Sequence, residues 1–247
     1  MLEEISTELE NRFNDHLRGT LKRNNKKRSK NVHVTDLTSP CARQSWYYRK
    51  LEEPEKDNAL TGILFMGNIV HAAIPLSKRN EVSFIADVRN MKPLKSLSEI
   101  TDVNTYDCVS GTADEIIEYK GETCIVDKKT YSSKRGWNPK EPDESYVWQL
   151  NIYKLLMYIT EGVEAKYGAI FYMDVATRFE KPLVFPMELK SIPEIQEFVL
   201  KRLDELKMLV PPAKTVTWKC KYCPWAPNKG GPCDVTGAEI LEATRKK

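Results

Sequence analysis

Two carboxylates and a pair of lysines lie close together in the stretch GTADEIIEYKGETCIVDKKT, residues 111–130. Asp114 lies on one predicted strand, and Asp127, Lys128 and Lys129 lie on the next. A tight turn between them predicts that the two strands run antiparallel and side by side. Because alternate residues of a strand point to the same face, we expect Lys129 beside Asp127 and both near Asp114.

This combination suits the hydrolysis of a phosphodiester bond. Two carboxylates can hold a hard divalent cation, which activates water and neutralises charge on the phosphate. A nearby ammonium group positions the nucleophile or stabilises developing negative charge. The alternative is a solvated group of charges, since Asp and Lys are common at strand ends. The apolar run Cys-Ile-Val directly before Asp127 favours the catalytic interpretation.

The elements that would position these residues follow from hydrophobic periodicity and from turn residues. Helices are predicted over residues 1–18, from Thr38 or Ser39 with Pro40 in the first turn, over 61–74 before Pro75, over 143–161 and over 191–209. Strands are predicted over residues 81–88, 106–119, 122–130, 167–175 and 182–189. Gly162 is the expected C-cap of the 143–161 helix. This order of elements indicates an α/β (α+β) domain with a mixed central sheet flanked by helices.

Four short motifs lie on these elements in a fixed order. They are Gly67-x-x-x-His71, Gly111-x-x-Asp114-x-Ile116, Asp127-x-Lys129 and Gln149-x-x-x-Tyr153. Together they resemble the RecB-like branch of the PD-(D/E)xK nucleases, over about residues 33–235. The resemblance implies a restriction-endonuclease-like core at residues 81–210. An N-terminal helical region, residues 1–80, would precede it, and a cysteine-rich tail, residues 211–247, would follow it.

The resemblance also implies the ligands of a catalytic metal. His71, Asp114 and Asp127 would bind Mn²⁺ or Mg²⁺, with the backbone carbonyl of Lys128 as a further ligand. A histidine ligand favours Mn²⁺, because imidazole is softer than carboxylate. Taken by itself, His71 is more often an ordinary helix histidine than a metal ligand.

The remaining motif residues would act around that metal. By the resemblance, Lys129 would orient the attacking water or stabilise the transition state. Gln149 and Tyr153 would support this lysine and contact DNA at the edge of the site. Without the resemblance, Gln149 and Tyr153 are an ordinary i,i+4 pair on one face of a helix.

Six cysteines occur in the chain, and four of them have the placement of metal ligands. Cys220 and Cys223 form a C-x-x-C pair, Cys233 follows nearby, and Cys41 would complete the set if the two ends of the chain meet. Zinc and a [4Fe–4S] cluster are both chemically reasonable for these thiolates. The other two, at 108 and 124, lie in strand-like segments and are predicted to be small buried hydrophobic residues.

A subset of RecB-like nucleases has one cysteine before the core and three after it, which bind a [4Fe–4S] cluster. This subset includes the CRISPR-associated RecB-like exonucleases, the nuclease half of AddB and a eukaryotic replication nuclease-helicase. Cys41 and the Cys220-x-x-Cys223-Pro-Trp segment resemble that arrangement, and the compact chain fits the CRISPR-associated family best. The interval from Cys223 to Cys233 is longer than the family pattern. The cluster would join the tail to the N-terminal region.

The activity that the resemblance implies is a Mn/Mg-dependent DNA exonuclease acting on single strands or ends, often 5′ to 3′. It would process prespacers beside the CRISPR integrase. A stand-alone repair or viral recombination nuclease would use the same site, and a non-catalytic iron–sulfur DNA-binding module is the alternative of a different class. Aromatic residues that could stack on bases include Trp46, Tyr47, Tyr48, Trp137 and Trp148, although several of them are expected in the core instead.

Composition is that of an ordinary globular protein, with 41% hydrophobic and 30% charged residues and a formal net charge of +3. Residues 20–30 hold six Lys or Arg and no acid, which suits either phosphate binding or a solvated linker. No apolar run is long enough to span a bilayer, and the N-terminus lacks the apolar segment of a signal peptide. We therefore expect a cytoplasmic protein without a membrane partner.

Overall fold

The computed structural model describes residues 31–51, 67, 69, 71, 73–100, 105–135, 138–178 and 182–245. The chain divides into two compact units, residues 1–30 with 55–75 and residues 31–54 with 76–247. In the first unit, Gly67, Ile69, His71 and Ala73 are helical, in agreement with the helix predicted over 61–74. The helix predicted over 1–18 and the basic run at 20–30 lie outside the described residues.

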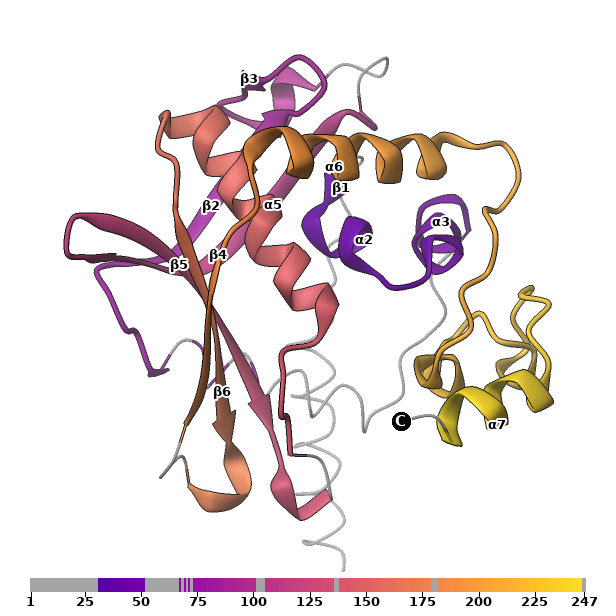
Figure 1. Ribbon diagram of the computed structural model, residues 1–247. Helices are drawn as coiled ribbons and strands as arrows, with labels where there is room; N and C mark the ends of the chain where they lie inside the picture. Colours follow the sequence, from indigo (N-terminus) through magenta and orange to yellow (C-terminus); the bar gives the residue numbers. More distant parts are fainter. Residues whose placement is uncertain are drawn as a thin grey trace, which may run out of the picture. The chain divides into compact units, whose positions relative to one another are not determined.

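A mixed β-sheet forms the centre of the second unit (Figure 1). Its strands are β1 (Val32–His33), β2 (Arg79–Asp87), β3 (Lys92–Pro93), β4 (Cys108–Tyr119), β5 (Glu122–Tyr131), β6 (Tyr167–Asp174) and β7 (Leu183–Glu188). Along the sheet their order is β3-β2-β4-β5-β6-β7, and β1 pairs in parallel with β4. Only β5 and β6 are parallel within the main path. The mixed sheet predicted from the sequence is confirmed.

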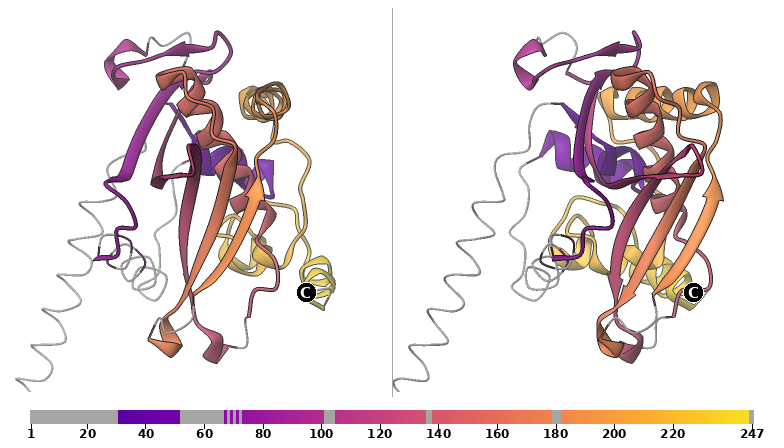
Figure 2. Two further views of the ribbon diagram at one scale, coloured as in Figure 1. Left: turned by 60° about the vertical axis from the view of Figure 1, so that its left-hand side comes forward. Right: turned by 90° about the vertical axis from the view of Figure 1, so that its left-hand side faces the viewer.

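Helices α5 (Glu144–Glu161) and α6 (Ile192–Lys207) lie on the same face of this sheet (Figure 2). α5 connects β5 to its parallel neighbour β6, the crossover that a parallel pair requires. Its inner face buries Leu150, Ile152, Leu155 and Leu156 at 0% exposure. The remaining described helices are α2 (Val34–Thr38), α3 (Ala42–Lys50) and α7 (Gly237–Arg245).

The sequence locates the long elements well because each carries its own boundary signals. Asp143 caps the N-terminus of α5 by accepting from the backbone N–H of Ser145, and Gly162 ends the helix with φ 71°. Lys120 and Gly121 both have positive φ, 52° and 81°, which is the geometry of a tight two-residue hairpin turn between β4 and β5. Both boundaries agree with the prediction.

The prediction was wrong near residue 40. Two short helices, α2 and α3, lie where the sequence suggested one helix starting at Thr38 or Ser39. Pro40 precedes α3, and Cys41 is its N-cap. The break at Ser39 is stabilised by Arg202, whose guanidinium donates to the carbonyls of Leu37 and Ser39 at 2.9 and 2.6 Å. That tertiary contact has no local signal in the sequence.

Among the described residues, no helix is both long enough and apolar enough to cross a membrane.

Candidate active site

β4 and β5 carry the predicted catalytic residues near the middle of the sheet. The strand register pairs Glu115 with Val126, so Asp114 lies opposite Asp127. One carboxylate oxygen of Asp127 lies 2.7 Å from Lys129 Nζ. The backbone N–H of Lys128 donates to Asp114 Oδ2 at 2.7 Å. The structure thus brings Asp114, Asp127 and Lys129 together.

Charge and burial act on Lys129 in opposite directions. Burial by itself would lower the pKa of this amine, but the charge and hydrogen bond of Asp127 outweigh it, and the pKa lies above its ordinary value. Asp127 is 1% exposed. Lys129 therefore remains an ammonium group held against a buried carboxylate.

The other lysine of the pair points to the opposite face of the sheet. Lys128 Nζ forms a buried ion pair with Glu115 at 2.7 Å, with both side chains at most 1% exposed. Glu115 also accepts from the backbone N–H groups of Leu76 and Ser77, each at 3.0 Å. This ion pair holds β4 and β5 together on the face of the sheet opposite Lys129. The role predicted for the backbone carbonyl of Lys128 remains a prediction.

Glu81 on β2 is a further carboxylate at this site that the sequence analysis missed. The register pairs Asn80 with Glu115 and Val82 with Ala113, so Glu81 lies opposite Asp114. Carboxylate oxygens of Glu81 and Asp114 lie within 4.8 Å of each other. Glu81 has φ 49°, an uncommon value for a residue other than glycine. Glu81 lies beside Asp114 only because of the register of β2 against β4. No short sequence motif indicates that register.

α5 places Gln149 and Tyr153 beneath the same part of the sheet. The side-chain amide of Gln149 donates to Tyr153 Oη at 2.9 Å. Burial raises the pKa of Tyr153, and the negative charge of Asp127 raises it further. Tyr153 packs on Gly111, where an added Cβ would come within 2.8 Å of its ring. The glycine of the Gly111-x-x-Asp114 motif is thus needed for the close approach of α5 to β4.

The sequence that carries β4, β5 and α5 matches a family of known proteins. The model of the PD-(D/E)XK nuclease superfamily matches residues 97–227, more than half of the 247 residues. The chain belongs to the PD-(D/E)XK nuclease superfamily. This membership assigns a metal-dependent nuclease activity, for which carboxylate oxygens beside a lysine are a suitable donor set.

Among solved structures, the crystal structure of SSO0001 is similar to this nuclease. The TM-score is 0.57 at 19% sequence identity, and the match covers 92% of this chain and 98% of that chain. At this identity the similarity shows the fold alone. A comparison with curated proteins gives no match.

Tyr146 is a second residue of the nuclease site that the sequence analysis missed. Lys129 Nζ lies 4.6 Å from the centroid of its ring, a cation–π contact. Burial raises the pKa of the Tyr146 hydroxyl, partly offset by the nearby Lys129. Tyr146 precedes Gln149 by three residues on the same helix, so the i,i+3 spacing could have indicated it.

The predicted metal ligand His71 lies on the helical segment of the first unit and is half-buried. Its role as a ligand remains a prediction that rests on the Gly67-x-x-x-His71 motif.

Four cysteines of the nuclease line one pocket in the second unit. Cys41 comes from the start of α3, and Cys220, Cys223 and Cys233 come from the tail. The amide of Gln44 donates to Cys223 Sγ at 3.6 Å, and the backbone N–H of Thr217 lies 3.4 Å from Cys220 Sγ. The structure thus gathers the four cysteines that the sequence grouped, although 179 positions separate Cys41 from Cys220.

The long interval between Cys223 and Cys233 folds back on itself. A short 3-10 turn at Pro227–Lys229 is followed by Gly230 at φ 75°. At Gly231 an added Cβ would lie 2.2 Å from the backbone of Trp225, so only glycine fits this crossing. The N–H of Cys233 then donates to the carbonyl of Trp225 at 2.9 Å. The extra residues therefore form a closed loop that returns Cys233 to the pocket.

The remaining two cysteines differ from each other. Cys108 is 2% exposed, and burial raises the pKa of its thiol to about 11. Cys124 is half-buried. The prediction of a buried hydrophobic residue is confirmed for Cys108 and was wrong for Cys124, because Cys124 lies near the exposed end of β5.

Proposed function

We propose that this nuclease is a DNA exonuclease that acts on single strands or on DNA ends, with 5′ to 3′ polarity. The observation that carries the proposal is the buried pair of Asp127 and Lys129 beside Asp114, with an oxygen–nitrogen distance of 2.7 Å. A buried carboxylate paired with an ammonium group, open to a second carboxylate, suits metal-assisted attack on a phosphodiester.

Each residue has a separate part in the proposed reaction. By the resemblance, Asp114, Asp127 and His71 would hold Mn²⁺ or Mg²⁺, with the carbonyl of Lys128 as a further ligand. The metal would supply an activated water and neutralise phosphate charge. Lys129 donates hydrogen bonds to the attacking water or to the negatively charged phosphate oxygens.

Gln149 and Tyr153 on α5 support the proposed catalytic residues of β4 and β5. Their hydrogen bond of 2.9 Å fixes the Tyr153 hydroxyl beneath the strands. Because Tyr153 is only 4% exposed, it supports the ligand carboxylates more than it contacts solvent.

The second part of the proposal is a [4Fe–4S] cluster bound by Cys41, Cys220, Cys223 and Cys233. Thiolates around a single zinc lie about 3.8 Å apart, because each Zn–S bond is about 2.3 Å. The four cysteines line one pocket, and one cysteine before the nuclease core with three after it supports a cluster of several irons over one zinc ion.

The proposed biological role is that of a CRISPR-associated RecB-like exonuclease that trims prespacer DNA beside the integrase. One cysteine before the nuclease core and three after it support this assignment. The superfamily match supports DNA as the substrate.

The decisive experiment compares the wild-type protein with Asp127→Asn, after anaerobic purification. Single-stranded DNA labelled at either end is incubated with Mn²⁺ or Mg²⁺. Asp127→Asn keeps the shape of the side chain but removes a charge, so we expect activity to fall by about 100-fold or more. The matched control is Asp204→Asn, which changes a 63% exposed carboxylate on α6 and should stay fully active.

The labelling position separates the outcomes. Early release of mononucleotide from the 5′ label, with a slowly shortened 3′-labelled strand, is the expected pattern. Equal activity in the wild type and Asp127→Asn would refute the placement of the site. No cleavage by folded, iron-loaded wild type with either metal would favour a DNA-binding module without catalysis.

A further inference from the structure

Of the aromatic residues considered for base stacking, the described ones pack mainly within the protein, as expected for several of them. Trp46 and Tyr47 are 8% and 5% exposed. Trp148 is stacked on Phe198 with ring centroids 3.7 Å apart, and Tyr48 packs edge-on against Trp225. Trp137 lies outside the described residues. Stacking on DNA bases therefore requires other aromatic side chains.

The 3-10 segment η4, Trp218–Tyr222, presents two such rings. Its sequence alternates aromatic and basic residues around Cys220, as Trp-Lys-Cys-Lys-Tyr. Tyr222 is 66% exposed. The rings of Trp218 and Tyr222 meet edge to face with centroids 6.2 Å apart. Trp218 is half-buried. Aromatic rings beside cations are the usual surface on which single-stranded nucleic acids stack.

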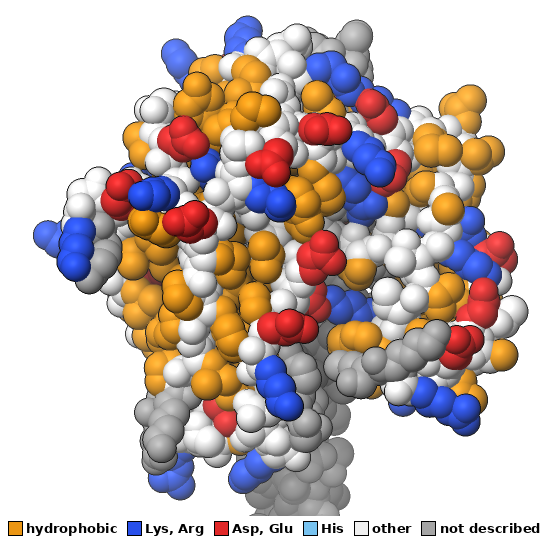
Figure 3. Space-filling model, in the orientation of Figure 1, with side chains coloured by type: hydrophobic (Ala, Val, Ile, Leu, Met, Phe, Trp, Pro, Cys, Tyr) orange, Lys and Arg blue, Asp and Glu red, His pale blue; other side chains and the backbone are white. Residues whose placement is uncertain are grey.

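Lysines accompany both rings. Lys221 is exposed, and its Nζ lies 5.8 Å from the centroid of Tyr222. Lys219 Nζ lies 5.9 Å from the centroid of Trp218. On the face shown in Figure 3, Lys and Arg side chains are interspersed with Asp and Glu. Net charge alone therefore does not mark a DNA path on that face, and the combination of ring and cation is the more specific feature.

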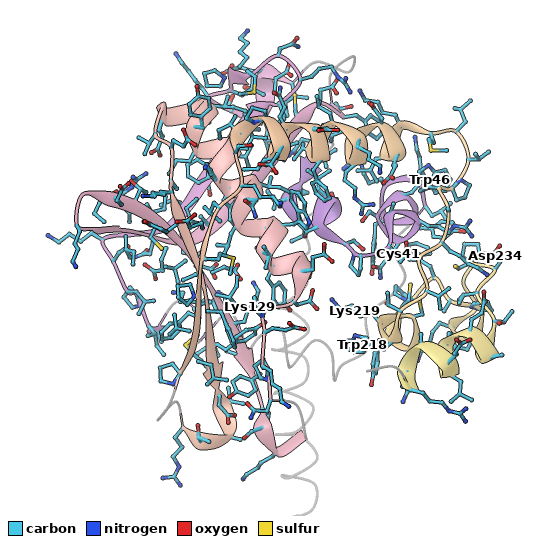
Figure 4. The ribbon with its side chains drawn as sticks, viewed as in Figure 1. Cys41, Trp46, Lys129, Trp218, Lys219 and Asp234 are labelled. Atoms are coloured by element: carbon cyan, nitrogen blue, oxygen red, sulfur yellow. The ribbon has the colours of Figure 1, made fainter. Side chains whose placement is uncertain are left out.

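One ion pair fixes η4 beside the nuclease site. Lys219 Nζ lies 2.9 Å from Asp143 Oδ2, and Asp143 is the N-cap of α5. One turn further along α5, the ring of Tyr146 contacts Lys129. A short chain of contacts thus runs from η4 to the catalytic lysine, and Figure 4 shows Trp218 and Lys219 on the side of the tail that faces Lys129.

We infer that Trp218, Lys221 and Tyr222 form a stacking platform that receives unpaired bases of the DNA strand next to the nuclease site. The inference rests on the proposed function and adds to it the reason for a single-strand preference. In a duplex the faces of the bases are covered by their neighbours, so only an unpaired strand can stack on these rings. Lys221 contributes a phosphate contact, and Lys219 keeps the platform in place.

Binding of fluorescently labelled oligo-dT, measured by anisotropy in EDTA, tests the platform apart from catalysis. We expect Trp218→Ala and Tyr222→Ala each to raise the Kd by about 5-fold or more. Lys221→Ala should lower the salt dependence of log Kd by about 0.7, the loss of one phosphate contact. The matched control is Tyr158→Ala, a 40% exposed tyrosine on α5 about 18 Å along the helix from Tyr146.

Trp218→Phe and Tyr222→Phe keep an aromatic face and guard against a folding artefact. They should bind within about 2-fold of the wild type, and iron content verifies that the neighbouring cysteines are intact. Unchanged oligo-dT binding by folded, iron-loaded Trp218→Ala and Tyr222→Ala would overturn the platform. An equal loss of duplex binding would also overturn it, because stacking cannot explain that loss.

The two proposals fail in different ways. Weaker binding by the alanine variants of a protein that hydrolyses nothing would keep the platform and refute the nuclease. Asp127-dependent hydrolysis with unchanged binding by those variants would refute the platform alone.

Discussion

Neighbours on three elements keep the charge of Lys129 in place. Asp127 on the same strand pairs with it, Asp114 on β4 adds a second negative charge, and the ring of Tyr146 on α5 covers it. Burial alone would lower the pKa of the amine, yet these neighbours raise it. The raised pKa of Lys129 favours its proposed role as a hydrogen-bond donor over a role as a base.

Glu81 gives the first prediction at the level of single residues. A positive φ costs a residue other than glycine about 1 kcal/mol or more, and such strain persists at functional sites. We expect Glu81→Gly to raise the free energy of unfolding by about 1 kcal/mol and to lower nuclease activity by about tenfold. Glu81→Gln should lower activity similarly, with little change in stability, since only a charge near the metal is lost. Urea unfolding and the Mn²⁺ dependence of hydrolysis measure the two effects.

Glu188→Gln is the matched control for this prediction, because Glu188 is an exposed strand carboxylate on β7. It should change neither property. If Glu81→Gln kept full activity at every Mn²⁺ concentration, Glu81 would have no part in the metal site.

At this scale the sequence predicted the residues that lie within a short motif and missed those that depend on pairing between elements. Asp114, Asp127 and Lys129 are recognisable because the β4–β5 hairpin is local. Glu81 joins them only through the register of β2 against β4, across residues 88–107. A single sequence carries no signal for that register.

The packing of α5 against β4 is the main determinant of the site among the elements. α5 approaches closely at Gly111, where an added Cβ would lie 2.6 Å from Val34 Cγ2 and 2.8 Å from Tyr153 Cε1. The sequence predicted α5 from its periodicity and its caps. The sequence does not predict how closely α5 approaches β4, because this distance depends on α2, α5 and β4 together.

Gly111→Ala is therefore the second prediction. The added methyl group must displace Val34 or Tyr153, and overpacking of this kind costs about 1–3 kcal/mol. We expect the midpoint of urea unfolding to fall accordingly and nuclease activity to fall with it, because Tyr153 lies next to Asp127. Tyr153→Phe in the same background would not restore stability, since the clash involves a ring carbon.

Gly237→Ala is the control for this change. An added Cβ at Gly237 meets nothing within 4 Å, and the residue begins α7. Its substitution should be neutral or stabilising, because alanine favours a helix over glycine by about 1 kcal/mol. If Gly111→Ala were as stable as Gly237→Ala, the close approach of α5 to β4 would be wrong.

For the whole second unit, the contacts of α3 with the end of α6 and with the tail join distant parts of the chain. Arg43 Nε donates to the carbonyl of Pro212 at 2.6 Å, and Trp46 Nε1 donates to the carbonyl of Met208 at 2.8 Å. Tyr47 Oη donates to the carbonyl of Pro232 at 3.3 Å. The sequence predicted this joining only through the cysteines. The hydrogen bonds use backbone carbonyls, which no side-chain pattern reveals.

The last prediction concerns the [4Fe–4S] cluster that we propose for the cysteine pocket beside these contacts. Under anaerobic conditions, Cys41→Ser should lose iron, acid-labile sulfide and visible absorbance, because one of four ligands is gone. A group present at about 1,000 times its dissociation constant adds about 4 kcal/mol to the free energy of unfolding. Its loss should therefore lower the Tm of a domain of this size by roughly 10 °C. Cys124→Ser, a half-buried cysteine outside the pocket, is the matched control and should keep iron and Tm unchanged. The hydrogen bonds from Arg43 and Tyr47 to the tail remain in Cys41→Ser. We therefore expect the tail to stay docked, and the loss of stability to equal the contribution of the proposed cluster alone. Full iron content in folded Cys41→Ser would exclude this cysteine as a ligand, and zinc in place of iron in the wild type would identify the site as a structural zinc centre.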